Sequence, residues 1–331
     1  MKAVGWGIVG TGQISATVVE QIGTSLIAKA VAVSSRSPEK AQSFADRAGI
    51  AKAYGGLPAL LEDSDVEAVY IGLPHGLHVD AVVAALDAGK HVLCEKPMGR
   101  TVMELRRIAE HPRAEELIVA EGFMLRHQPQ WRWIEDALAK EAIGTVTAVH
   151  IHNALTVPRS PPDPTRIHVP GDGSLILDIG CYAFHLARTI FRAEPVSVSA
   201  HMGYDPGGHD TLIDATLRFK HGTAHITVAT TLKSARRIHI LGTDGNIEIF
   251  SPVHSPSGSA RLLASLKGED GPPKELVFPI GSQYGLQLEE FSRAIRQKRQ
   301  PLVPLSNAIG NARVLDAVVH SASHSGCWAA P

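Results

Sequence analysis

The sequence predicts an α/β domain with a doubly wound parallel sheet, followed by an α+β domain with an open, predominantly antiparallel sheet. Three observations lead to this prediction. The chain has 331 residues, more than a single hydrophobic core usually serves. Short β-rich runs alternate with helical runs up to about residue 120, and after about residue 145 apolar residues recur with a period of two. We place the two domains at residues 1–122 and 123–331.

The first domain has the alternation of βαβ units. Strands are expected at 3–9, 28–34, 66–73, 90–95 and 117–123, and helices at 13–22, 37–49, 78–89 and 101–111. Strands and helices that alternate at this pitch indicate a parallel sheet. In the first helix, Ile14, Val18, Val19 and Ile22 share one face, as expected for a helix that packs on a sheet.

The second domain has the pattern of half-buried strands. Apolar and polar residues alternate at 145–152, 195–202, 211–219, 223–230, 236–242 and 246–250. Such strands form an antiparallel sheet with one face on helices and the other available to a partner subunit. Residues 253–273, rich in Ser, Gly and Pro, are expected to form a long surface loop. The amphipathic runs 287–297 and 305–323 are expected to pack on the sheets.

Composition excludes several classes of function. A formal net charge of −1 and scattered Lys and Arg residues argue against a nucleic-acid partner. No apolar run reaches the ~20 residues that cross a bilayer, so we expect no membrane partner. The three cysteines, Cys94, Cys181 and Cys327, lie far apart without a disulfide or zinc spacing. Gly5, Gly7 and Gly10 interrupt the apolar start of the chain, so we expect no leader and a cytoplasmic protein.

A glycine-rich segment, GIVGTGQIS at 7–15, follows the first strand and opens the first helix. Gly10 and Gly12 allow a tight turn and the close approach of a pyrophosphate to the helix N-terminus. Ser15 stands where the third glycine of a dinucleotide fingerprint is usual, and a small residue still lets helix and strand pack closely. The alternative is a plain glycine-rich turn. The expected cofactor-binding residues here are Gly10, Thr11, Gly12, Gln13 and Ile14.

The end of the second strand bears on the choice of dinucleotide. An NAD site usually has Asp or Glu ~20 residues downstream of the glycines, but here the sequence is Val-Ser-Ser-Arg-Ser at 33–37. Ser35 and Arg36 suit a 2′-phosphate, so we predict NADP(H) in preference to NAD(H). The alternative is that Arg36 is a solvated loop residue and that either nucleotide binds.

A lysine and a later helix are candidates for chemistry. Lys96 follows an apolar strand whose carboxyl end lies at the edge where doubly wound sheets bind ligands. In the segment 171–190, Asp178, Tyr182 and His185 are spaced to share one face of an α-helix. An acid, a phenol and an imidazole on that face either line a cleft together or form a solvent-exposed polar face. The spacing favours neither of these interpretations.

These residues resemble the glucose–fructose oxidoreductase/inositol dehydrogenase (Gfo/Idh/MocA) family over nearly the whole chain. The resemblance rests on four segments: GIVGTGQIS, GLPHGLHVDAVVAALDAGKHVLCEKPM, GSLILDIGCYAFHLAR and LGTDGNIEI. It implies an N-terminal Rossmann domain and a C-terminal open antiparallel sheet. It also implies catalysis by Lys96, Asp178 and Tyr182. Many members have His where this sequence has Tyr182, which makes the chain similar to the dihydrodiol and NADP-dependent aldose dehydrogenase branch.

The resemblance further implies a cis bond between Lys96 and Pro97, Glu95 near the lysine or the nicotinamide ribose, and a homo-oligomer, dimer or tetramer. Oxidising a carbinol requires a base, and a free phenol, with a pKa of about 10, is a weak one at neutral pH. A nearby ammonium favours phenolate. We therefore expect Tyr182 to be the acid/base, Lys96 to activate it and hydrogen-bond the substrate oxygen, and Asp178 to orient both.

Weaker candidates surround these residues. Leu73, Pro74, His75 and His78 follow the third strand run and are expected near the cofactor, with His78 at a helix start. The His-x-x-His spacing lacks further ligands nearby, so we predict no metal. His185 either assists Tyr182 and the substrate or is a satisfied helix histidine. The candidates for binding substrate hydroxyls in the proline-rich loop are Arg159, Arg166 and His168.

The sequence thus predicts an NADP(H)-dependent oxidoreductase that acts on a sugar, a polyol or a related cyclic alcohol or ketone. Two other functions use the same scaffold. One is a non-catalytic regulator that binds the dinucleotide, although such proteins usually lose the acid/base residues that this chain has. The other is a transient-redox enzyme that keeps its nucleotide tightly bound and shows no net change in NADPH absorbance.

Overall fold

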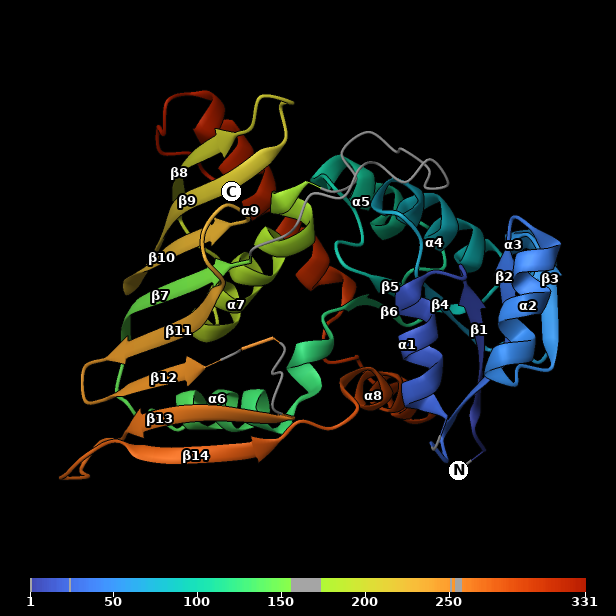
Figure 1. Ribbon diagram of the computed structural model, residues 1–331, viewed down its shortest axis with the longest axis horizontal. Helices are drawn as coiled ribbons and strands as arrows, with labels where there is room; N and C mark the ends of the chain where they lie inside the picture. The colour runs from blue at the N-terminus through green and yellow to red at the C-terminus, as the bar shows by residue number, and fades with distance from the viewer. Residues whose placement is uncertain (1, 24, 156–173, 251, 254–257) are drawn as a thin grey trace. The chain divides into compact units, whose positions relative to one another are not determined.

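The computed structural model describes residues 2–23, 25–155, 174–250, 252–253 and 258–331 (Figure 1). The chain divides into two compact units, each described here by itself. The first unit is Met1–His127 with Ser282–Ile309, and the second is Gln128–Gly281 with Gly310–Pro331. The sequence prediction placed every residue after 122 in the second domain. The units therefore differ from the prediction, because part of the C-terminal region belongs with the first sheet.

In the first unit, the described residues form a six-stranded parallel sheet in the order β3-β2-β1-β4-β5-β6, the strand order of a Rossmann domain. Its strands are β1 (Val4–Val9), β2 (Ala28–Ser35), β3 (Lys52–Gly55), β4 (Ala68–Ile71), β5 (His91–Glu95) and β6 (Val119–Gly122). Its helices up to β6 are α1 (Gln13–Ile22), α2 (Pro38–Ala48), α3 (Leu57–Leu61), α4 (His78–Asp87) and α5 (Val102–Ala109). Short 3₁₀ turns lie at η1 (His75–Leu77) and η2 (Met124–His127). The predicted α/β class is confirmed, although β3, four residues long, was too short for the sequence pattern to reveal.

Apolar burial explains the central strands of this sheet. Every residue of β1 and of β4 is buried, as expected for strands covered on both faces. Helix α1 buries Val18, Val19 and Ile22 as predicted, but its fourth buried residue is Ser15, while Ile14 is half-buried. A small side chain therefore occupies the place where α1 lies nearest the sheet.

Helix α8 (Gln283–Gln297) belongs to the first unit because its side chains complete that core. It packs on α1. The buried Trp6 of β1 donates from Nε1 to Ser292 Oγ at 3.1 Å, and its ring lies 5.3 Å from that of Phe291. Arg296 of α8 also pairs with Glu67 at 2.7 Å. Sequence periodicity showed that this segment is an amphipathic helix but could not show which sheet it covers.

In the second unit, the described residues form an eight-stranded sheet in the order β14-β13-β12-β11-β7-β10-β9-β8, antiparallel except between β7 and β10. The first five strands along the chain are β7 (Val146–Ala154), β8 (Ser197–Tyr204), β9 (Asp210–Phe219), β10 (Gly222–Ala229) and β11 (Ala235–Gly242), followed by β12 (Asn246–Phe250), β13 (Ser259–Ser265) and β14 (Lys274–Pro279). The predicted surface loop at 253–273 is wrong for 259–265, because Ala260, Leu262 and Ala264 alternate inward as β13.

Helices cover one face of this sheet. Helix α6 (Pro129–Ala139) and helix α7 (Cys181–Phe191) lie against it, and α9 (Leu305–Ser323) ends in this unit (Figure 1). The buried Trp131 of α6 donates from Nε1 to the Pro252 carbonyl at 2.9 Å. On the outer face, the rings of His150 and His225 stack at 5.2 Å. That a partner subunit covers the outer face stays a prediction. In the described part of the chain, every helix is too short or too polar to cross a bilayer.

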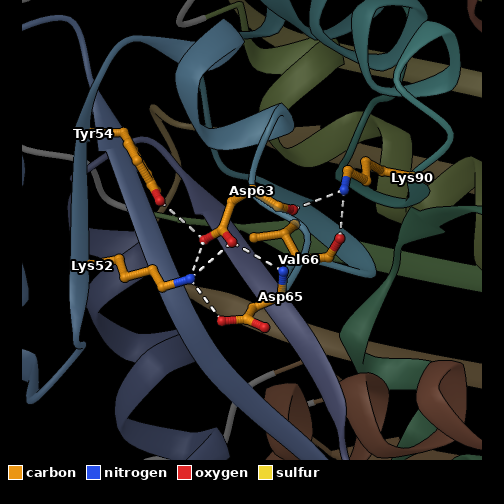
Figure 2. Close-up of polar contacts among 6 residues, drawn as sticks. All are labelled: Lys52, Tyr54, Asp63, Asp65, Val66 and Lys90. Atoms are coloured by element: carbon orange, nitrogen blue, oxygen red, sulfur yellow. Dashed lines mark hydrogen bonds and ion pairs between the residues drawn. The ribbon is translucent and has the colours of Figure 1, made fainter.

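A polar network ties down the amino end of the first sheet, shown in Figure 2. The Asp63 carboxylate accepts hydrogen bonds from Lys52 Nζ at 2.8 Å, from Tyr54 Oη at 3.1 Å and from the Asp65 N–H at 3.0 Å. Lys90 Nζ donates to the main-chain carbonyls of Asp63 and Val66. Burial would raise the pKa of Asp63, but the bonds from Lys52, the Asp65 backbone and Tyr54 outweigh it and hold this pKa below its usual value. The network fixes the turn between α3 and β4.

We predict that Asp63→Asn lowers the free energy of unfolding by about 1–3 kcal/mol at pH 7, because a buried charged acceptor is lost. Because the folded pKa of Asp63 lies below the unfolded value of 3.8, its contribution is complete above that pH. The difference from wild type should therefore shrink as the pH falls below 3.8. Urea unfolding at pH 7 and at pH 3 measures it. Asp65→Asn, at an exposed partner of Lys52, is the control and should cost less. Equal losses in both variants would contradict the prediction.

Candidate active site

The glycine loop between β1 and α1 is shaped by contacts inside the first unit. Gly10 has a φ of +101°, and a Cβ at this position would lie 2.8 Å from the Gly72 carbonyl oxygen. Its N–H donates to the Ser34 carbonyl at 3.0 Å, which joins the loop to the end of β2. The fold itself therefore requires glycine here.

Gly12 has a different environment. It is the N-cap of α1, without a side-chain cap and without acidic residues in the first turn, and a Cβ here would meet no atom within 4 Å. The free space at Gly12, together with the N–H groups that have no partner within the first turn of a helix, suits an anion at the start of α1. Thr11 and Ile14 are half-buried and Gln13 is exposed around it. The residues present thus fit the pyrophosphate of a dinucleotide.

Ser15 is fully buried at the third position of the fingerprint. A Cβ added to Gly72, which follows β4, would lie 2.8 Å from Ser15 Oγ. The helix and the loop after β4 are therefore close enough that only small residues fit between them.

The carboxyl end of β2 presents a cation. Ser35 is half-buried and Arg36 is exposed. The first acid after β2, Glu39, accepts the Ser37 hydroxyl at 2.6 Å, and this hydrogen bond lowers the pKa of Glu39. Ser37 also caps α2 by accepting the Lys40 N–H. Arg36, which forms no ion pair among the described residues, is the charged group next to the strand end.

Lys96 begins a turn whose backbone is held by buried side chains. The Lys96–Pro97 bond is cis. The Lys96 N–H donates to Glu95 Oε2 at 3.3 Å, and the Met98 N–H donates to Glu121 Oε1 at 2.9 Å. Glu95 is 7% exposed and Glu121 is 2% exposed. We call residues 96–98 the Lys96 turn.

His78 holds the same turn from a neighbouring loop. It is the first residue of α4, as predicted, and is fully buried. Its Nδ1 lies 2.8 Å from the Pro97 carbonyl oxygen, and its Nε2 lies 2.7 Å from the carbonyl oxygen of the half-buried Leu73. His78 thus joins the segment after β4 to the Lys96 turn. Whether it also meets a cofactor stays a prediction.

His75 lies beside His78, with ring centroids 5.7 Å apart and edge to face. Burial, followed by the positive charge of Lys96, lowers the pKa of His75 to about 3, so its imidazole is neutral at pH 7. The half-buried Pro74 starts the 3₁₀ turn in which His75 lies. Among the described residues, no group of three or more His, Cys, Asp or Glu side chains could hold a metal ion.

In the second unit, the segment that carries Asp178 and Tyr182 is not one regular α-helix. Ile176–Gly180 is a π-helix, and α7 starts at Cys181, whose N–H bonds the Ile176 carbonyl five residues earlier. The predicted α-helical spacing is therefore wrong in its first turn, because the π-helix adds a residue to the turn there. Such π segments often occur at functional sites. Asp178 and Tyr182 are half-buried.

His185 is fully buried in α7, while its main-chain carbonyl accepts the Thr189 hydroxyl. It therefore does not face solvent in this unit, and its contact with a substrate stays a prediction. Arg159, Arg166 and His168 lie outside the described residues.

Asp210, at the start of β9, fixes the beginning of the π-helix. Its carboxylate accepts the N–H groups of Leu175 at 2.9 Å and Ile176 at 2.8 Å, and the Ser174 hydroxyl at 3.3 Å. Three donors at one helix start are satisfied by this single acid. Asp210 and Glu121 could not be recognised in the sequence, because the backbone groups that each one binds lie far away along the chain.

Comparison with known proteins agrees with this architecture. The model of the oxidoreductase family with an NAD-binding Rossmann fold matches residues 4–123, and the model of the GFO/IDH/MocA C-terminal domain matches residues 131–248. The chain is 32% identical to D-xylose 1-dehydrogenase (NADP(+)) 2 of Haloferax volcanii, over 96% of this chain and 97% of that protein. It is 30% identical to trans-1,2-dihydrobenzene-1,2-diol dehydrogenase of Homo sapiens, over 96% of each.

A solved structure extends the comparison to three dimensions. The aldose-aldose oxidoreductase from Caulobacter crescentus, complexed with glycerol, aligns with a TM-score of 0.88 and 26% identity, over 99% of this chain and 100% of that one. The two family models together match residues in both sheets, and the solved structure aligns with nearly the whole chain. The protein belongs to the GFO/IDH/MocA family of oxidoreductases.

Proposed function

We propose that this oxidoreductase transfers a hydride between NADP(H) and a carbinol or ketone carbon of a sugar, a polyol or a related cyclic alcohol. The observation that carries the proposal is the carboxyl edge of the first sheet. There β1 ends at the open anion position beside Gly12, and β5 ends at the Lys96 turn, held from three sides by buried side chains. At this edge of the sheet, the anion position suits the phosphates of a dinucleotide, and the Lys96 turn suits the reacting oxygen of a substrate.

The proposed cofactor site starts at Gly10–Ile14, continues past Leu73, Pro74 and His75, and includes Glu95. The pyrophosphate would lie on the first N–H groups of α1, where the N-cap residue Gly12 makes no side-chain cap among the described residues. The bound nicotinamide would supply the hydride acceptor or donor. NADP(H) is proposed over NAD(H), since Arg36 is exposed beside Ser35 where an NAD site would have an acid. The NADP(+)-dependent relative supports this choice.

In the proposed mechanism, Tyr182 takes the hydroxyl proton of the substrate during oxidation and returns it during reduction. Lys96 is proposed to stabilise the phenolate and to hydrogen-bond the reacting oxygen, since an ammonium favours the charged form of a phenol. Asp178 is proposed to accept hydrogen bonds from substrate hydroxyls and from the lysine.

The proposed substrate class follows from the relatives and from the donor set. D-xylose and trans-1,2-dihydrobenzene-1,2-diol, which occur in the relatives' names, both have neighbouring hydroxyl groups. A carboxylate such as Asp178 can accept two such hydroxyls at once. The aldose-aldose oxidoreductase favours a second candidate, a transient-redox enzyme that keeps its nucleotide. It would copurify with nucleotide and show no net absorbance change with a single sugar.

We predict that Gly12→Ala weakens NADP⁺ binding by roughly 10-fold or more while thermal stability is kept, since the added methyl enters the space left for phosphate. Gly10→Ala is the contrasting variant, because its φ and the Gly72 contact strain the fold itself. Nucleotide titration and thermal melting measure both variants. Unchanged nucleotide affinity in Gly12→Ala would argue against a phosphate at this helix.

We predict that Lys96→Ala and Tyr182→Phe each lower kcat by about 10²- to 10⁴-fold, the range expected for an acid/base group. Nucleotide affinity should stay within about threefold, since neither side chain is proposed to hold the phosphates. Absorbance of the reduced nicotinamide, with NADP⁺ and a panel of aldoses, polyols and cyclic alcohols, measures turnover. The matched controls are Lys220→Ala, at an exposed position in the turn between β9 and β10, and Tyr204→Phe, at the exposed end of β8. Near-wild-type rates in the first pair contradict the mechanism.

We predict that Arg36→Ala lowers the preference for NADP⁺ over NAD⁺ by about 10- to 100-fold in kcat/KM, because a charge-assisted bond to the 2′-phosphate is lost. Arg47→Ala, on the exposed side of α2, is the control and should leave the preference unchanged. Steady-state kinetics with both nucleotides measures the ratio. A wild-type enzyme that prefers NAD⁺ would refute the cofactor assignment.

A further inference from the structure

A buried tyrosine and a buried glutamate lie directly behind the Lys96 turn. Tyr70, in the middle of β4, is fully buried, and its hydroxyl donates to Glu95 Oε1 at 2.7 Å. Glu95 is the last residue of β5, the neighbour of β4 in the sheet. Apart from His91 at the start of β5, the other residues of these two strands are apolar. Polar groups buried this deeply cost free energy unless they are paired, and they are often kept for function.

The two oxygens of Glu95 reach in opposite directions. Oε1 accepts the Tyr70 hydroxyl from the core, while Oε2 accepts the Lys96 N–H at 3.3 Å. The Glu95 carboxylate also interacts with the positive charge of Lys96. A Cβ added to Gly122 of β6 would lie 3.3 Å from Glu95 Oε1, so a larger residue at 122 would crowd the carboxylate. The pair therefore connects the rigid centre of the sheet to the backbone and the charge of one lysine.

Glu95 is the ionisable group of this cluster that is bonded to both Tyr70 and Lys96. Burial raises the pKa of Glu95, opposed by the hydrogen bond from Tyr70 and by the charge of Lys96. Burial also raises the pKa of Tyr70, of Cys94 and of Tyr284 from α8, so these three stay protonated at pH 7. A further charged side chain nearby is that of Glu121, from β6, which pairs with Cys94 in the strand register.

We propose that the Tyr70–Glu95 pair is a positioning unit for Lys96, which orients the lysine through its backbone and holds its ammonium beside a fixed carboxylate. The proposal rests on the proposed function in one respect, namely that Lys96 acts on the substrate oxygen. It gives Tyr70 a role in turnover although Tyr70 is at the middle of a buried strand and meets neither solvent nor substrate.

The direction of the pH effect follows from the hydrogen bonds. The carboxylate form of Glu95 can accept from both Tyr70 and Lys96, so turnover should fall when the pH drops through the pKa of Glu95. Since the Tyr70 hydroxyl lowers that pKa, its removal raises the pKa further and moves the acid limb of kcat to higher pH. Because the folded pKa of Glu95 is raised, ionising it costs stability as the pH rises above 4.5.

Two variants test the proposal in the full-length protein. Tyr70→Phe is expected to move the acid limb of kcat upward by about half a pH unit or more. Glu95→Gln is expected to abolish that limb and to lower kcat by roughly 10- to 100-fold, since a misplaced catalytic group lowers the rate of the chemical step. Its melting temperature at pH 8 should not fall below that of wild type, because a buried charge is removed.

Tyr54→Phe is the matched control. Tyr54 also donates to a buried carboxylate of the first unit, Asp63, but at the amino end of the sheet. It should change stability without moving the pH profile. If both Tyr→Phe variants left the limb in place, or if Glu95→Gln kept kcat within about twofold of wild type, the pair would be structural only and the proposal would be refuted.

A chemical readout separates this proposal from the proposed function. Acetylation of Lys96 by acetic anhydride is followed by peptide mass spectrometry, relative to the exposed Lys220 of the same molecule. Glu95→Gln should speed the labelling of Lys96 by about threefold or more, because the side chain is no longer held beside a fixed carboxylate and reaches the reagent more often. Unchanged labelling refutes the positioning role even without a substrate. Faster labelling in a protein with no turnover on any substrate refutes the proposed function and supports the pair.

Discussion

The site in the first unit depends on one constraint: buried backbone groups after β4 and β5 must find hydrogen-bond partners away from water. Three side chains meet this requirement at the Lys96 turn. Glu95 takes the first N–H, His78 the middle carbonyl and Glu121 the last N–H. The lysine is thereby aimed by residues from two strands and a helix. Precision of this kind comes from rigid elements and not from the turn itself.

The same pair of groups, a tyrosine and an acid, occurs at both ends of the first sheet with different effects. At the amino end, Tyr54 and Asp63 are joined by Lys52, so that charge is compensated and the turn before β4 is secured (Figure 2). At the carboxyl end, Tyr70 and Glu95 are hydrogen-bonded to each other and buried from solvent, and Glu95 precedes Lys96 in the chain. The arrangement at the amino end stabilises the folded first unit. The second retains an acid whose burial is costly, as functional sites often do.

Local signals in the sequence sufficed for some of this structure. Gly10 and Gly12 follow a strand and open a helix, so their loop was predictable, and so were the parallel sheet and the position of Lys96. Contacts between distant segments were not. The residues near Tyr70, Glu121 and Asp210 in the sequence do not indicate which groups these side chains bind. Each of these hydrogen bonds joins residues that are more than 20 positions apart. The four-residue β3 and the Ser-rich β13 also escaped, since periodicity needs length and apolar contrast.

The π-helix has a consequence for how the chain can vary. An α-helix turns by about 100° per residue, and the π segment at Ile176–Gly180 accommodates a surplus residue without shifting α7. Deleting one residue there would restore α-helical winding and rotate Asp178 by about that angle relative to Tyr182. Apolar burial alone would tolerate such a change, because the segment would remain a helix. The length of this segment therefore sets the angle between the Asp178 and Tyr182 side chains around the helix axis.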